Sequence, residues 1–295
     1  MNLCSKKTIK ELFSKYEAKP LKRLGQNFLI DKGVVKKVVE AAELEPNDAV
    51  IEIGPGIGVL TQEIAKKVHL GKVMAIEKDP KMIEILKETL KEFNNIEIIQ
   101  GDILNLQLLN SKLQITNSKQ IQNSKFKIQN SFKIVANLPF YLTAPIIRKF
   151  LEMEKPPKEM VFVVQKEVAQ RICSKPGQMS ILAVSVQFYA ETKIIKYISK
   201  KSFWPQPKVD SAIIKIVPRR FYVPVLCQFR EQFFKIVKAG FSQPRKQLIN
   251  NLAKQLKIDK IKIKDWLLQN KIEPSQRAET LTVEDWVNLT KTFIK

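Results

Sequence analysis

The stretch "DAVIEIGPGIG", residues 48–58, decides the fold. Its first half is an apolar run of the kind that forms a buried strand, and its second half carries glycines at positions 54, 56 and 58. A helical pattern, "VLTQEIAKKV", follows at once. Glycines between a strand and a helix allow a tight turn and let the backbone approach a ligand closely. Taken alone, this turn is as compatible with a purely structural role as with a binding site.

The segments on either side continue the alternation of strand and helix. The helical pattern "PKMIEILKETLKEF" covers residues 80–93. Further strands are predicted at 72–79, 95–104, 132–140 and 159–165. This order predicts an α/β fold, a Rossmann-like, doubly wound parallel sheet with its ligand at the carboxyl ends of the strands.

Polar residues stand where three consecutive strands end. Glu77 lies 23 positions after Gly54, where a carboxylate can accept hydrogen bonds from both ribose hydroxyls. Asp102 ends the next strand and is a candidate for the adenine edge. The glycine pattern is G-x-G-x-G, which differs from the dinucleotide fingerprint. Together these strand ends resemble the S-adenosylmethionine pocket of class I methyltransferases.

The stretch "NLPFYL", residues 137–142, follows the fourth strand and contains no acid, base, thiol or metal ligand. An adenine exocyclic amine needs little proton removal if two acceptors hold its hydrogens and the methyl donor is already activated. Asn137 and the Leu138 carbonyl can be those acceptors, Pro139 stiffens the turn, and Phe140 offers a stacking face. An ordinary strand-end turn is the alternative. The position beside Gly54 favours the catalytic interpretation.

Composition restricts the classes of function. Lys and Arg number 51 against 29 Asp and Glu, a net charge of +22 that indicates a polyanionic partner, unless it reflects a general bias towards lysine. His69 is the single histidine, so a His-dependent triad is disfavoured. Cys4, Cys173 and Cys227 have no metal-site spacing and suit a reducing compartment. No apolar run approaches a membrane span, and we expect a cytoplasmic protein without bound metal.

The chain divides into three predicted parts, the second of which contains an insertion. Residues 1–21 form an N-terminal extension, residues 22–218 the Rossmann-like domain, and residues 219–295, where the pattern becomes purely helical, a small C-terminal all-helical RNA-binding domain. Residues 110–131 are a polar, near-duplicated, low-complexity insertion within the second part. We favour a tolerated expansion for this insertion, with contact to RNA as the alternative.

Seven blocks in order resemble the ribosomal RNA adenine dimethyltransferases. They are "KRLGQNFLID" (22–31), "EIGPGIGVLT" (52–61), "GDIL" (101–104), "NLPF" (137–140), "QKEVAQRI" (165–172), "FWPQPKVDSAI" (203–213) and "QRAETLTVEDW" (276–286). The resemblance implies an enzyme, a monomer, that uses S-adenosylmethionine to dimethylate two adjacent adenosines near the 3′ end of small-subunit ribosomal RNA. It also implies a role in biogenesis of the small ribosomal subunit.

The resemblance also assigns roles to residues. The cofactor would be bound by Gln26, Asn27, Leu29, Gly54, Gly56, Glu77, Asp102, Ile103 and Asn137. Asn137, Leu138, Pro139 and Phe140 would form the catalytic motif, although the family usually has Tyr where Phe140 stands. Phe203 would sandwich the target base against Phe140, unless it is simply a core residue. RNA phosphates would be gripped by Lys22, Arg23, Arg148, Lys208, Arg245 and Lys246.

Three other functions are compatible with parts of the pattern. A large-subunit methylase of the macrolide-resistance type would share the cofactor and the Asn-Leu-Pro-aromatic motif, but residues 241–252 and 276–286 resemble the small-subunit branch. A non-catalytic nucleic-acid-binding factor on the same fold should have lost cofactor residues, and none is lost here. A restriction DNA methylase would normally show Asp or Asn before Pro-Pro-aromatic.

Overall fold

The computed structural model describes residues 1–105, 131–219 and 229–293. Most of the polar insertion at 110–131, and Cys227, therefore lie outside the described residues. The chain forms two compact units, the first made of Met1–Ala169 and Lys193–Pro218, the second of Gln170–Thr192 and Arg219–Lys295. The segment 170–192, which the sequence placed with the Rossmann-like domain, thus packs with the C-terminal helices.

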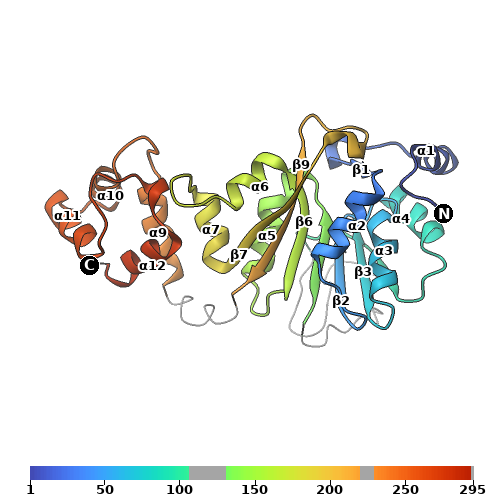
Figure 1. The fold of residues 1–295 in the computed structure, drawn as a ribbon, viewed down its shortest axis with the longest axis horizontal. Helices are drawn as coiled ribbons and strands as arrows, with labels where there is room; N and C mark the ends of the chain where they lie inside the picture. Colours follow the sequence, from blue (N-terminus) through green and yellow to red (C-terminus); the bar gives the residue numbers. More distant parts are fainter. Residues whose placement is uncertain (106–130, 220–228, 294–295) are drawn as a thin grey trace. The chain divides into compact units, whose positions relative to one another are not determined.

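A seven-stranded sheet is the centre of the first unit (Figure 1). Its spatial order is β4-β3-β2-β5-β6-β9-β7. The strands are β2 (Ala49–Ile53), β3 (Lys72–Glu77), β4 (Ile96–Gln100), β5 (Lys133–Asn137), β6 (Glu159–Gln165), β7 (Ala190–Ile198) and β9 (Ser211–Pro218). The pairs from β4 to β6 are parallel, and β9 is antiparallel to β6. The predicted α/β fold class is confirmed.

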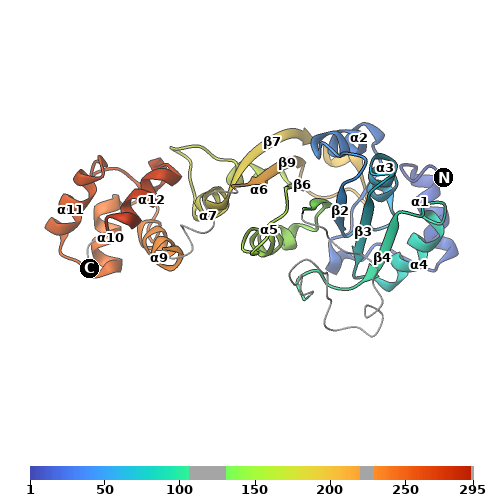
Figure 2. The same cartoon turned by 90° about the horizontal axis from the view of Figure 1, so that it is seen from below.

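Helices cover both faces of the sheet, which explains why its central strands are apolar throughout. Figure 2 shows α2 (Lys32–Ala41) and α3 (Val59–Lys67) on one face and α5 (Thr143–Leu151) on the other. α4 (Pro80–Thr89) follows β3, and α6 (Lys166–Ile172) follows β6. Asp31 caps α2, and Asp79 caps α4, which begins with Pro80. None of the helices in the described part of the chain is long and apolar enough to span a membrane.

The N-terminal residues pack onto the first unit. Helix α1 (Lys6–Lys15) is capped by Ser5 and buries Phe13 along its inner face. The Phe13 ring makes edge contacts with Phe28, at 5.4 Å between centroids, and with Trp204, at 5.8 Å. Those two partners belong to a short antiparallel ribbon formed by β1 (Phe28–Leu29) and β8 (Phe203–Trp204). Helix α1 therefore supports the segment that leads into the strand ends.

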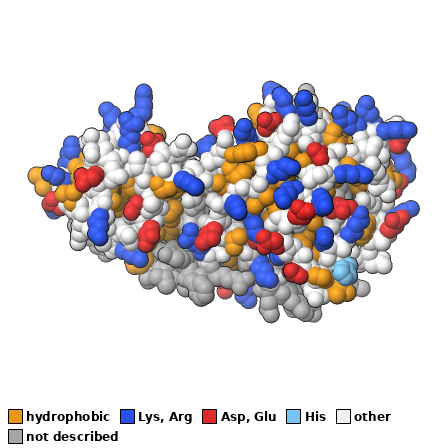
Figure 3. Space-filling model, in the orientation of Figure 1, with side chains coloured by type: hydrophobic (Ala, Val, Ile, Leu, Met, Phe, Trp, Pro, Cys, Tyr) orange, Lys and Arg blue, Asp and Glu red, His pale blue; other side chains and the backbone are white. Residues whose placement is uncertain are grey.

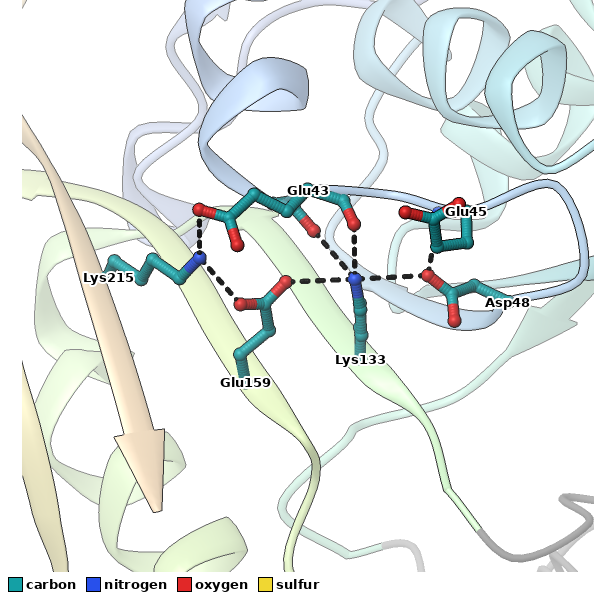
Figure 4. Close-up of polar contacts among 7 residues, drawn as sticks. Glu43, Glu45, Asp48, Lys133, Glu159 and Lys215 are labelled. Carbon is teal, nitrogen blue, oxygen red and sulfur yellow. Dashed lines mark hydrogen bonds and ion pairs between the residues drawn. The ribbon is translucent and has the colours of Figure 1, made fainter. Parts of the chain in front are cut away.

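A buried ionic network holds three strands together where they begin (Figure 4). Lys133 Nζ, at the start of β5, lies 3.0 Å from Asp48 Oδ2 and 3.1 Å from Glu159 Oε1. Asp48 immediately precedes β2, and Glu159 begins β6. Lys215 extends the network, 2.7 Å from Glu159 Oε2 and 2.8 Å from Glu43 Oε1. These pairs fix β2, β5 and β6 relative to one another, and hence the placement of their carboxyl ends.

The second unit is helical around an aromatic core. Its helices are α7 (Ile181–Tyr189), α9 (Arg230–Gly240), α10 (Leu248–Leu256), α11 (Lys260–Gln269) and α12 (Val283–Lys291). Trp266, Trp286 and Phe233 are fully buried, and Phe188 stacks on Phe233 with centroids 4.0 Å apart. A Cβ at Gly240 would lie 2.4 Å from Trp286, so this close helix packing requires glycine. The C-terminal helices predicted from the sequence are confirmed.

Candidate active site

A cavity of about 310 Å³ opens at the carboxyl ends of β2 to β5 in the first unit. This volume lies at the lower end of the range for small-molecule sites, roughly 300–1,000 Å³. The structure brings together every residue predicted for the cofactor, the catalytic motif and base stacking. Lining the cavity are Gln26, Asn27, Leu29, Gly54, Gly56, Glu77, Asp102, Ile103, Asn137, Leu138, Pro139, Phe140 and Phe203.

The glycine turn between β2 and α3 has two distinct requirements. Gly54 and Gly56 both have positive φ, +65° and +60°, a region that disfavours other residues. A Cβ built on Gly54 would meet no atom within 4 Å, so this backbone faces open space. A Cβ on Gly56 would lie 2.9 Å from the Phe28 ring. Gly54 therefore keeps room for a ligand, whereas Gly56 also keeps room for protein packing.

The Glu77 carboxylate is held in place by backbone N–H groups. Oε2 accepts from Gly56 N at 3.1 Å, and Oε1 accepts from Lys78 N at 2.8 Å and Asp79 N at 2.9 Å. Burial raises the pKa of Glu77, and these three hydrogen bonds oppose that rise. A carboxylate has about four acceptor positions. Glu77 is therefore oriented and still has acceptor capacity on a cavity wall.

Asp102 follows β4 and lies on the same wall. Its Oδ2 accepts from Lys78 Nζ at 2.9 Å, and its Oδ1 accepts from Leu104 N at 3.0 Å. Burial opposes ionisation, but the hydrogen bonds from Lys78 and Leu104 outweigh it, so the pKa of this carboxyl lies below its usual value. Ile103 is apolar and 4% exposed. This pair can offer an acceptor and a flat apolar contact to a purine.

Asn137 ends β5, and its amide orientation is fixed. Nδ2 donates to the backbone carbonyl of Asn27 at 2.8 Å. Since a carbonyl only accepts, the amide nitrogen must point that way and Oδ1 points elsewhere. The Leu138 N–H donates to Val163 O at 3.1 Å. Among the residues that the structure describes, none donates to Asn137 Oδ1 or to the Leu138 carbonyl. Two acceptors are thus available at the cavity.

The two predicted stacking residues differ in burial. Phe140 begins a short 3₁₀ turn, Phe140–Leu142, and is half-buried. Phe203 is 3% exposed, pairs with Leu29 in the β1–β8 ribbon and packs in the apolar core. Both side chains line the cavity. Phe203 therefore has the packing of a core residue and also meets the cavity, so the two interpretations are compatible.

Gln26 has a structural role that the sequence did not suggest. Its Oε1 accepts from Leu21 N at 2.8 Å, and its Nε2 donates to Asp79 Oδ2 at 2.8 Å. The side chain thus ties the N-terminal segment to the cap of α4. Asn27 Nδ2 donates to Gly25 O at 3.0 Å within the same turn, while the Asn27 carbonyl holds Asn137.

Glu52 is a cavity residue that the sequence analysis did not select. It lies in β2, is 1% exposed, and its Oε2 has no hydrogen-bond partner within the described residues. Burial raises the pKa of this carboxyl to about 8. One sequence feature could have identified Glu52, namely that it is an acidic residue inside an apolar predicted strand, two positions before Gly54. Lys78 and Tyr141 also line the cavity and were not predicted.

Five of the six residues predicted to grip phosphates do not line the cavity. Arg23 and Lys208 are exposed in the first unit, as is Arg148, whose Nε is 3.1 Å from Glu152 Oε1. Arg245 and Lys246 are exposed in the second unit. The backbone of the sixth, Lys22, begins the turn Lys22–Leu24. Figure 3 shows many other Lys and Arg side chains on the surface, so these five are not distinguished from their neighbours.

Comparison with known proteins places this geometry among RNA methyltransferases. The family model described as ribosomal RNA adenine dimethylase matches residues 18–295. A relative from Dehalococcoides mccartyi, named ribosomal RNA small subunit methyltransferase A, is 42% identical, covering 95% of this chain and 90% of its own. A protein of the same name from Alkaliphilus oremlandii is 39% identical, covering 99% and 98%.

Solved structures share the fold. The crystal structure of the 23S rRNA methyltransferase ErmE has a TM-score of 0.70 and 25% identity, covering 90% of this chain and 99% of that one. A dimethyladenosine transferase from Plasmodium falciparum has a TM-score of 0.68 and 24% identity, covering 89% and 95%. The second likeness concerns the fold alone.

Proposed function

The chain belongs to the ribosomal RNA adenine dimethylase family, and from this membership we propose that it methylates N6 of two adjacent adenosines near the 3′ end of small-subunit ribosomal RNA. S-adenosylmethionine is the methyl donor in this proposal. The small-subunit substrate is supported by 39–42% identity to the relatives named for that activity. The large-subunit alternative is weaker, because the structure named for it is 25% identical.

The orientation of Asn137 is the observation that carries the mechanism. Its Nδ2 is bound to the Asn27 carbonyl, so Oδ1 is available to accept one hydrogen of the adenine amine. The Leu138 carbonyl accepts the other. Two acceptors draw both hydrogens to one side and direct the nitrogen lone pair out of the ring plane. Catalysis then rests on positioning and hydrogen bonding, which explains why the motif holds no titratable side chain.

The cavity walls suit the proposed cofactor. Gly54 leaves open space at its missing Cβ, and Glu77 has acceptor capacity for ribose hydroxyls. When bound, the cofactor supplies a methyl group already activated by a sulfonium. The protein residues therefore need only to bind, orient and exclude water.

The target base would be held between aromatic rings. Phe140 is half-buried and Phe203 is buried, and both line the cavity. A Phe in place of the usual Tyr keeps the stacking face and loses only the hydroxyl. The base must leave its own stack to reach this site. The second transfer requires the monomethylated amine to rotate beside Asn137, so space at that side chain controls dimethylation.

A non-catalytic factor on the same fold is the second candidate, and the site argues against it. Such a protein has no need for an open cavity or for oriented acceptors. Here the cavity, the oriented Glu77 and the two free acceptors are all retained. In this proposal the substrate is a small subunit that has not yet been methylated, so the protein would act during ribosome assembly.

Transfer of label from methyl-labelled S-adenosylmethionine to unmethylated ribosomal subunits tests this function. We expect label on small subunits and none on large subunits. Asn137→Ala should slow transfer on the order of 10²- to 10³-fold, whereas Asn288→Ala, which removes an exposed amide from α12, should leave it unchanged. Label confined to large subunits would establish the alternative substrate. An absence of label on both would support the non-catalytic candidate.

A further inference from the structure

We propose that Tyr197 and Lys166 form a second RNA subsite, in which an unpaired nucleotide flanking the target adenosine stacks on Tyr197 and pairs its phosphate with Lys166. This inference rests on the proposed function and adds a location for RNA outside the catalytic cavity. Neither residue lines that cavity. Neither is among the phosphate contacts predicted from the sequence.

The pair has the chemistry of a nucleotide platform. Tyr197 lies on β7, at the edge of the sheet, and half of its side chain is exposed. Lys166 Nζ lies 5.4 Å from the centroid of its ring. A half-exposed aromatic ring beside a cation presents a stacking surface and a positive charge at one place. Single-stranded nucleic acid is bound by this combination, with bases on aromatic rings and the backbone along basic side chains.

The two segments that carry the platform, the start of α6 and the end of β7, are tied together by Asp210. Its backbone carbonyl accepts from Lys166 N at 3.0 Å, just after β6. Its Oδ1 accepts from Lys200 N at 3.0 Å, just after β7. Because one residue bonds both segments, Lys166 and Tyr197 keep fixed positions relative to each other. A preformed platform lowers the entropy cost of ordering the side chains when RNA binds.

Lys166 lies nearer to the catalytic motif than Tyr197 does. β5 and β6 are parallel neighbours, and Asn137 is in register with Val163. At about 3.3 Å per residue and 4.8 Å between strands, Gln165, the residue before Lys166, has its Cα roughly 8 Å from that of Asn137. Tyr197 is farther away, because β7 is the third strand from β5 in the sheet, which is roughly 14 Å at the same spacing. That separation is roughly four rises of 3.4 Å along one strand of a stacked helix, which suits a nucleotide a few positions from the target.

Charge around the platform favours RNA as the occupant. Residues 193–209 contain five lysines and no acid. Lys193, Lys196, Lys201 and Lys208 are exposed. Figure 3 shows blue side chains gathered along the upper edge of the first unit, over the connection between β7 and β9. Pro207, within that connection, lines the cavity. The basic surface therefore runs from the platform to the site where the target base would enter.

The test compares Tyr197→Ala with Tyr197→Trp in steady-state methyl transfer to small subunits. We expect Tyr197→Ala to raise KM for subunits on the order of tenfold, because a base loses its stacking partner. Tyr197→Trp should stay within about twofold of the unsubstituted protein, because it keeps an aromatic face. The dissociation constant for S-adenosylmethionine, measured by calorimetry, should be unchanged in both and also reports on folding.

Lys166→Ala tests the phosphate contact, and Lys15→Ala is its matched control. Lys15 lies at the same 5.4 Å from the ring of Tyr16 but belongs to α1. We expect Lys166→Ala to lessen the slope of log KM against log salt by roughly one, as loss of one phosphate contact requires. Lys15→Ala should leave the slope unchanged. A side chain with only a structural role would not alter this slope.

The outcomes separate this proposal from the proposed function. If the unsubstituted protein methylates no small subunits, the proposed function fails. If it is active and Tyr197→Ala has an unchanged KM, the subsite is wrong and the function stands. If Tyr197→Trp is as impaired as Tyr197→Ala, stacking is excluded as the role of the ring. A loss of kcat without a change in KM would equally overturn a role in binding.

Discussion

The side-chain amide of Asn137 donates a 2.8 Å hydrogen bond to the backbone carbonyl of Asn27, a residue 110 positions earlier in the chain. This bond connects the end of β5 to the N-terminal turn that precedes β1. It determines which amide atom of Asn137 is left for a ligand in the cavity. The turn itself is held by Gln26, which bonds Leu21 and Asp79. The N-terminal segment therefore contributes to the geometry of the proposed methyl-accepting site.

Asn137→Ala and Asn137→Asp should reduce activity to different extents. Alanine removes the acceptor, and we expect kcat to fall on the order of 10²- to 10³-fold, as for loss of one group in a preorganised site. Aspartate keeps an acceptor but loses the donor to the Asn27 carbonyl, so its rate should lie between those of alanine and asparagine. Single-turnover methyl transfer measures both rates. An Asn137→Asp rate equal to that of the unsubstituted protein would show that the hydrogen bond to Asn27 does not orient the side chain.

Glu52 should make stability fall with rising pH. Burial raises its folded-state pKa to about 8, above the value of 4.5 that an exposed Glu has. The stabilising contribution of the protonated carboxyl is thus complete below pH 4.5 and is lost as pH rises towards 8. Relative to Glu52→Gln, the unsubstituted protein should lose up to about 1.4 kcal/mol of unfolding free energy per pH unit in this window. Urea unfolding between pH 5 and 8 measures the difference.

The exposed Glu92→Gln is the control for that experiment, because it removes a carboxyl without a burial cost. Its unfolding free energy should follow that of the unsubstituted protein at every pH. A parallel pH dependence for Glu52→Gln and the unsubstituted protein would mean that Glu52 ionises normally in the folded state.

Gly54→Ala and Gly56→Ala should separate binding from stability. Both positions have positive φ, so each substitution should cost roughly 1–2 kcal/mol of unfolding free energy. Gly56→Ala adds a clash with Phe28 and should be the less stable variant. Gly54→Ala places a methyl group in the open space of the cavity and should bind S-adenosylmethionine more weakly. Thermal unfolding and calorimetric titration check the two effects, and stronger destabilisation by Gly54→Ala would contradict them.

Lys133→Met should destabilise the sheet by roughly 3–5 kcal/mol, because it removes a cation that two largely buried carboxylates share. Asp48 loses its ion-pair partner in this variant, and Glu159 keeps only Lys215 (Figure 4). Adding Glu159→Gln should restore part of the loss. The exposed ion pair of Lys66 and Glu63 provides the control, since Lys66→Met should change stability by less than about 1 kcal/mol. Denaturant unfolding measures these three variants and Glu159→Gln alone, and a double substitution whose effect equals the sum of its two single substitutions would show that the network is not coupled.

The sheet and most of the cavity could be predicted because their signals are local. The apolar run before Gly54, the acid that ends β3 and the acid two residues after β4 follow directly from strand periodicity. The docking of α1 could not be predicted in this way, since Phe13 finds its partners only in the folded chain. The tie from Gln26 to Asp79 joins residues 53 positions apart and has no sequence signature. Glu52 was missed because burial, which makes it unusual, is a tertiary property.

Mapping of the modified nucleosides in small-subunit RNA tests the central claim most directly. Unmethylated small subunits would be incubated with S-adenosylmethionine and the protein, and the RNA digested and analysed by mass spectrometry. We predict N6,N6-dimethyladenosine at two adjacent positions near the 3′ end, and far less of it after the same incubation time with Asn137→Ala. Dimethyladenosine elsewhere in the RNA, or its undiminished formation by Asn137→Ala, would contradict the account.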